Sequence, residues 1–124
     1  SASLARTMGF VDAIAKKGFS PDKLAKINLF ETPQMFCDLY CLEPGQSQKP
    51  HAHPGATKFY CVLEGTGRFT VGAEARVLGQ GSVAFAGPGE LHGVENESKA
   101  RLVLLVAMAP HPTFGPERLR GESL

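Results

Sequence analysis

Residues 45–65, GQSQKPHAHPGATKFYCVLEG, contain the pattern from which the fold of this chain is predicted. This stretch contains His51 and His53, which are separated by one residue and followed by a β-prone run. A second stretch, GSVAFAGPGELHGVEN at residues 81–96, contains His92, so three of the 4 histidines in the chain lie in these two segments. Histidines gathered in two glycine-punctuated segments indicate one shared site.

An extended strand directs residues i and i+2 to the same face, so His51 and His53 bring two imidazoles to one point. Imidazole is a common protein ligand for zinc, iron, copper and nickel. His92 from another strand would complete a three-ligand set with open positions for water or substrate. The alternative, for a His-x-His pair taken alone, is a polar exposed strand face. We predict one divalent metal ion on the three histidines, with iron, zinc, nickel and manganese all compatible.

Short β-prone runs separated by glycines extend on both sides of this pattern, and their even spacing favours an antiparallel sandwich or barrel. We expect strands at residues 26–30, 35–42, 58–63, 68–71, 75–78, 82–85 and 100–108. Glycines within residues 64–67 and 79–81 are typical of tight hairpins, because only glycine takes a positive φ without steric cost.

The first 25 residues differ, because apolar residues recur there at helical spacing. The apolar face consists of Leu4, Met8, Val11 and Ala15, widened by Phe10 and Ile14. We expect an amphipathic helix that ends near Gly18, followed by a very short helix at residues 20–22. The predicted organisation is a helical extension at residues 1–25, an all-β barrel at 26–110 and a C-terminal tail at 111–124.

The length of 124 residues suits one domain with one core. The formal net charge is only +1, so the chain lacks a basic field for phosphates and we expect no nucleic acid partner. The longest apolar run, residues 102–110, is far shorter than the roughly 20 residues of a spanning helix, so we expect no membrane partner. Three cysteines without zinc or redox spacing are interpreted as buried free thiols in a cytoplasmic protein. They are Cys37, Cys41 and Cys61.

The two histidine segments resemble the paired motifs of the cupin family, G-x5-H-x-H-x3 or x4-E-x6-G and G-x5-P-x-G-x2-H-x3-N. The first motif is matched by Gly45, His51, His53 and Gly65. The second is matched by Gly81, Gly89, His92 and Asn96. Lys58 replaces the glutamate and Gly87 replaces the proline. The resemblance covers roughly residues 26–108, and it implies an all-β double-stranded β-helix and a homodimer.

Lys58 stands where the resemblance implies an anionic fourth metal ligand. An ammonium group about 4 Å from a divalent ion is repelled by several kcal/mol even at an effective dielectric constant near 20. The side chain could carry its charge to water at the barrel mouth, the amine could lose its proton through burial, or the site could hold no metal. We expect the first arrangement. Lys58 could then bind a substrate carboxylate, whereas a solvated strand-end lysine is the simpler interpretation.

Strand alternation from Lys58 directs Tyr60 into the same interior, where it could hydrogen bond a substrate or pack as a core tyrosine. Lys58 and Tyr60 are therefore the candidate catalytic residues. Asn96 is expected to organise the turn after His92, and His111, between two prolines, is expected on the surface. One strand face is interpreted as sheet packing rather than as a pocket floor, and it consists of Cys37, Leu39 and Cys41.

Three histidines without a glutamate resemble the ligand set of thiol dioxygenases and some diketone-cleaving cupins. The predicted function is that of a metal-binding small cupin, an enzyme of the dioxygenase, isomerase or lyase type acting on a small polar or carboxylate-bearing molecule. The alternative is a non-catalytic cupin that binds or senses a small ligand or metal, because no convincing general base lies near His92 in the sequence. The cupin barrel supports many unrelated activities, so the resemblance is specific for fold rather than for chemistry.

Overall fold

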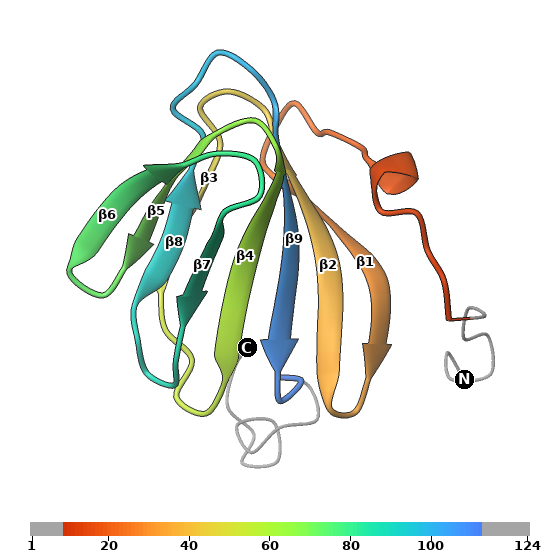
Figure 1. Cartoon of the computed structure of the whole chain (residues 1–124), viewed down its shortest axis with the longest axis vertical. Coiled ribbons are helices and arrows are strands. Elements are labelled where there is room, and N and C mark those ends of the chain that lie inside the picture. Colours follow the sequence, from red (N-terminus) through yellow and green to blue (C-terminus); the bar gives the residue numbers. More distant parts are fainter. Residues whose placement is uncertain (1–8, 113–124) are drawn as a thin grey trace.

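Two antiparallel sheets make up the computed structural model, which describes residues 9–112 (Figure 1). The first sheet has the order β1-β2-β9-β4-β7 and the second has the order β3-β8-β5-β6. The strands of the first sheet are β1 (Ala25–Thr32), β2 (Met35–Leu42), β9 (Leu102–Ala109), β4 (Thr57–Glu64) and β7 (Val83–Ala86). Those of the second are β3 (Ser47–His51), β8 (His92–Glu95), β5 (Gly67–Val71) and β6 (Glu74–Leu78).

The main hydrophobic core lies between the two sheets, because each contributes alternate side chains to it. The core consists of Tyr40, Leu42, Tyr60, Val62, Phe69, Ala84, Val94, Leu102, Leu104 and Val106. This is the predicted all-β double-stranded β-helix. Every strand expected from the sequence overlaps an observed one, and β3 and β8, which end and begin at histidines, complete the barrel.

The predicted hairpins at residues 64–67 and 79–81 are wrong. The first connects β4 to β5 and the second connects β6 to β7, so each carries the chain from one sheet to the other. The consecutive strands that do pair are β1 with β2 and β5 with β6. Gly65 has φ 83°, and a Cβ there would clash with the carbonyl oxygen of Arg101. Glycine is thus suited to a sharp corner between two sheets as well as to a hairpin, because both can require a positive φ.

The N-terminal extension is helical in its described part only over one 3-10 turn, η2 (Ile14–Lys16). The expected longer helix does not continue through Phe10, which is 87% exposed, and Leu4 and Met8 lie outside the described residues. No second helix forms at residues 20–22, where Ser20 Oγ instead accepts a hydrogen bond from the backbone N–H of Asp22. A short amphipathic helix is stable in water only where its apolar face packs against another part of the protein.

A second apolar cluster lies on the outer face of the first sheet. Its buried members are Leu29, Cys37, Leu39, Cys41 and Val103. Phe19 and Ala13 of the N-terminal extension pack against it. The interpretation of the Cys37 face as sheet packing is therefore confirmed, and Cys37 and Cys41 are buried free thiols while Cys61 is half-buried. Within residues 9–112, no helix is long and apolar enough to cross a membrane.

Candidate metal centre

Three imidazoles meet where β3 ends and β8 begins. His51 is the last residue of β3, and it pairs directly with His92, the first residue of β8. His53 follows in the connection to β4, so only one member of the His-x-His pair lies within a strand. The candidate ligand nitrogens of all three lie within 4.8 Å of one another. The structure therefore brings together the three histidines that the sequence singled out.

Hydrogen bonds fix the orientation of two of these rings. The Nδ1 atoms lie against backbone carbonyls, that of His51 at 2.9 Å from Lys49 O and that of His92 at 3.0 Å from Glu90 O. A carbonyl only accepts, so Nδ1 carries the proton and Nε2 has a lone pair that can bind a metal ion. Metal-ligating histidines commonly show this arrangement, with the second nitrogen donating to a carbonyl.

The buried Nε2 of His92 has no hydrogen-bond partner among the described residues. Burial lowers the pKa of His92 to about 4, and burial also lowers the pKa of His51. Both rings are therefore neutral near pH 7 and have an electron pair to donate. A buried polar atom left unpaired is costly unless something occupies its lone pair, and this cluster of imidazole nitrogens fits a divalent ion of the zinc, iron, nickel or manganese type.

Lys58 does not reach solvent, so the expected swing to the barrel mouth and the solvated strand-end interpretation are both wrong. The residue is 3% exposed, and its Nζ lies 3.2 Å from Gln48 Oε1 and 3.5 Å from His51 Nε2. Strand β4 lies between β9 and β7, and its inward face points into the barrel. Burial, followed by the positive charge of Lys26, lowers the pKa of Lys58 to about 7. The structure thus favours the alternative in which burial promotes proton loss.

Tyr60 is inward, as strand alternation predicted, but its hydroxyl is already satisfied. It is 1% exposed and donates to Gln48 Oε1 at 2.7 Å. Its ring belongs to the main core and lies 6.1 Å from the ring of His92, centroid to centroid. Burial raises the pKa of Tyr60 well above its ordinary value. Tyr60 is accordingly a neutral core tyrosine beside the histidines.

A cavity of about 390 Å³ opens beside the histidines. It is lined by Lys26, Phe36, Asp38, Tyr40, Gln48, His51, His53, Lys58, Met108 and Pro112. Sequence reasoning missed Lys26, Asp38, Tyr40 and Gln48. The signal for Asp38 and Tyr40 was the second face of the expected strand at residues 35–42, because alternation directs these two residues opposite to the Cys37 face. Burial raises the pKa of Asp38, whose carboxylate accepts a hydrogen bond of 2.9 Å from Asn28.

His111 is buried, so its predicted surface position is wrong. It is 5% exposed, its Nε2 lies 2.7 Å from Glu31 Oε1, and its ring packs edge-on against Phe36 at 5.7 Å. Both sequence neighbours of His111 are prolines, so its hydrogen-bond partner, Glu31, and its aromatic partner, Phe36, come from strands β1 and β2. This contact holds the segment before Pro112 against the β1–β2 turn near the cavity.

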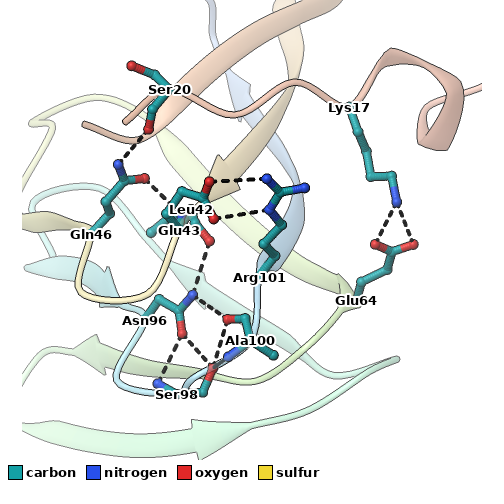
Figure 2. A network of polar contacts seen from close by, with 10 residues as sticks. All are labelled: Lys17, Ser20, Leu42, Glu43, Gln46, Glu64, Asn96, Ser98, Ala100 and Arg101. Carbon is teal, nitrogen blue, oxygen red and sulfur yellow. Dashed lines mark hydrogen bonds and ion pairs between the residues drawn. The ribbon is translucent and has the colours of Figure 1, made fainter. Parts of the chain in front are cut away.

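Asn96 organises a turn at the opposite end of the barrel, as predicted (Figure 2). It is 0% exposed, and its Nδ2 donates to Leu42 O at 3.0 Å and to Ala100 O at 2.8 Å. Its Oδ1 accepts from the backbone and side chain of Ser98. Figure 2 also shows the ion pair of 3.0 Å between Lys17 and Glu64, which ties the N-terminal extension to this end.

The sequence matches the family model of the cupin domain over residues 38–108, which is more than half of the chain. This chain belongs to the cupin family. The crystal structure of TT1209 from Thermus thermophilus superposes with a TM-score of 0.82 at 45% identity, covering 85% of this chain and 100% of the other.

Two curated relatives of this cupin come from Streptomyces. An uncharacterised protein of Streptomyces coelicolor is 33% identical over 88 residues, which are 69% of this chain and 81% of that protein. The tetracenomycin polyketide synthase protein TcmJ of Streptomyces glaucescens is 32% identical over 77 residues, which are 60% of this chain and 52% of TcmJ. The cupin domain here thus spans about half the length of the second relative.

Proposed function

We propose that this cupin is a metal-dependent enzyme that holds one divalent ion on His51, His53 and His92. The substrate is a small polar or carboxylate-bearing molecule bound in the adjoining cavity. The observation that carries the proposal is the buried, unpartnered Nε2 of His92, which lies within 4.8 Å of ligand atoms of the other two imidazoles. A barrel held together by packing alone has no need for this arrangement, because an unpaired buried nitrogen destabilises it.

When bound, the ion supplies Lewis-acid polarisation or activation of a bound molecule, as metals with open coordination positions do. The chain's own residues then orient the substrate. His51 and His92 are held by backbone carbonyls, so their rings need little rearrangement. Lys58 must give up its 3.5 Å contact with the lone pair of His51 Nε2, and Gln48 Oε1 already offers it another acceptor.

The second candidate is a binding or sensing module without turnover. The observation that favours it is the satisfied state of the polar groups beside the histidines, since Lys58 and Tyr60 both donate to Gln48. A catalytic acid or base must reach the substrate proton, and Asp38 is the acidic side chain among the residues that line the cavity. Turnover of a small acid by the metal-loaded protein would decide for the enzyme.

The test of the proposal is the metal content of protein purified without chelator, measured by elemental analysis. We expect about one equivalent of iron, zinc, nickel or manganese in the wild type and loss of the metal in the His51→Ala, His92→Ala double variant. A matched control, His111→Gln, removes an imidazole outside the cluster and should keep the metal. Substoichiometric metal in the wild type, even after reconstitution, would overturn the proposal.

Three further expectations belong to the same proposal. We propose a homodimer, a cytoplasmic location, and a barrel at residues 26–110 flanked by the extension at 1–25 and the tail at 111–124. Among the described residues, β1, β7, β3 and β6 are edge strands, and they support association because unpaired strand edges can pair with another chain. Light scattering checks the dimer, and a monomer mass that does not change with protein concentration would contradict it.

A further inference from the structure

Lys58 is a buried amine that forms no ion pair among the described residues, so its protonated form has no opposite charge in contact with it there. It is 3% exposed, and within residues 9–112 no carboxylate forms an ion pair with it. Its Nζ instead meets Gln48 Oε1 and lies 5.5 Å from the ring centroid of Tyr40 and 5.2 Å from that of Tyr60. Burying an ammonium is expensive unless an opposite charge compensates it. The charge of Asp38 acts on Lys58 without forming an ion pair, so an anionic ligand in direct contact with the amine would complete the compensation.

A second ammonium group faces the same cavity. Lys26 on β1 pairs with Tyr40 on β2, and its Nζ lies 5.4 Å from the Tyr40 ring centroid. Lys26 and Lys58 thus flank one aromatic ring and both line the cavity. The Tyr40 hydroxyl accepts a hydrogen bond of 3.4 Å from Gln48 Nε2, so it keeps its own proton to donate. The lining of the cavity thus includes three groups that can donate a hydrogen bond.

The charge of the lining limits the ligand further. With Lys58 protonated, the lining carries two positive charges, on Lys26 and Lys58, and one negative charge, on Asp38, so one net positive charge remains. A monoanion balances this lining, whereas a dianion such as phosphate would be repelled by Asp38. The volume of about 390 Å³ suits a small organic molecule. An organic cation would be repelled by the two lysines.

We propose that Lys58, Lys26 and the Tyr40 hydroxyl form a subsite for the carboxylate group of a small monocarboxylic acid. The subsite deepens the proposed function, because it lies against the histidine cluster and names the class of substrate that the cluster would act upon. Lys58 is the central donor, since burial removes water as a competitor for its ammonium group. Lys26, at the exposed mouth, contributes mainly attraction and orientation.

The subsite is testable without the metal. Lactate and its neutral isostere lactamide are titrated into chelator-treated, dialysed protein at low ionic strength, and binding is followed by NMR chemical shifts. We expect lactate to bind about tenfold or more tightly than lactamide, because only the carboxylate compensates Lys58. Lys58→Met should remove this preference, and Lys26→Met should reduce it. The matched control Lys99→Met removes an exposed charge at the opposite end of the barrel and should change nothing.

Equal binding of lactate and lactamide, or an unchanged preference in Lys58→Met that still unfolds cooperatively, would overturn the subsite. Stronger binding of inorganic phosphate than of lactate would also overturn it, because this result would show that the lining favours a dianion over a monoanion. The metal analysis is independent of this titration. A Lys58-dependent preference in a protein that takes up no metal would retain the anion subsite and remove the enzyme, whereas metal uptake without the preference would do the opposite.

Discussion

Lys58 is stabilised in its buried position by one amide oxygen and two aromatic faces rather than by a carboxylate. Replacing a buried charge by an apolar side chain of similar shape is often neutral or stabilising. Methionine matches the length of the lysine stem, so the Lys58→Met variant separates the cost of the charge from the packing of the chain. The resulting difference in stability depends on pH.

We expect the metal-free wild type, kept in chelator, to gain stability relative to Lys58→Met as the pH rises from about 7 to about 9. Burial lowers the pKa of Lys58 from 10.5 to about 7, so in this range the unfolded chain binds a proton that the folded chain has released. Raising the pH then favours the folded state, by about 2 kcal/mol over these two pH units as an upper estimate. Chemical denaturation at each pH measures the difference, and a difference independent of pH would show that Lys58 keeps its proton.

Lys58→Glu should tighten metal binding about tenfold or more, since it removes a repelling charge and places a carboxylate beside the three imidazoles. Competition with a chelator of known affinity measures the change. Lys58→Met is the matched control, because it removes the charge without adding a ligand. Equal metal affinities of the glutamate and methionine variants would contradict coordination by residue 58. Equal metal affinities of both variants and the wild type would contradict any influence of the lysine charge.

The histidine cluster was predictable from single residues, whereas the position of Lys58 was not. His51, His53 and His92 are distinguished by their spacing and by the glycine-punctuated segments around them, which together indicated one converging site. The direction of a long flexible side chain depends instead on what covers it. Gln48 and the ring of Tyr40 supply that cover, and neither stands at a position that the histidine pattern marks.

At the scale of elements, the register of β3 against β8 sets the distance between two of the three imidazoles. Gly93 follows His92 on β8, and a Cβ added there would lie 2.8 Å from Gln48 O and 2.9 Å from Pro50 N. Both contacts are with backbone of β3, so no side-chain rotation relieves them. The close approach of the two strands therefore depends on glycine at this position.

Gly93→Ala should push β3 away from β8, lower the free energy of unfolding by about 1 to 3 kcal/mol and weaken metal binding. Gly87→Ala is the matched control, because its Cβ would meet no atom within 4 Å and its φ is not in the left-handed region. We expect that control to stay within about 0.5 kcal/mol of the wild type. Denaturant unfolding and metal titration test both variants, and full metal affinity in Gly93→Ala would contradict the role of this contact.

Strand positions were more predictable than strand partners. Alternation and glycine punctuation located the strands, because both are local properties of the chain. Pairing was mispredicted at residues 64–67 and 79–81, where the turn chemistry suits a corner as well as a hairpin. The choice between them depends on which face each strand buries against the other sheet, and that is a property of the assembled barrel.

In the molecule as a whole, the chain forms two apolar clusters with different roles. The cluster between the sheets reaches the histidines through Tyr60. The outer cluster is partly covered by Phe19 of the N-terminal extension, whose ring lies 4.2 Å from the guanidinium carbon of Arg101. Arg101 in turn pairs with Glu43 at 3.0 Å at the end of the barrel opposite the histidines. The described part of the extension, residues 9–25, thus stabilises the scaffold without approaching the site.

This separation predicts the behaviour of Phe19→Ala. Loss of the half-buried ring should lower the free energy of unfolding by about 2 kcal/mol, because it uncovers the outer cluster and removes the contact with Arg101. Metal content and the lactate preference should stay unchanged, since the inner cluster keeps its packing. Phe10→Ala is the matched control, because Phe10 is 87% exposed and its loss should cost less than about 0.5 kcal/mol. If Phe19→Ala instead loses the metal, the two clusters are coupled, and residues 1–25 belong to the functional barrel rather than to an extension of it.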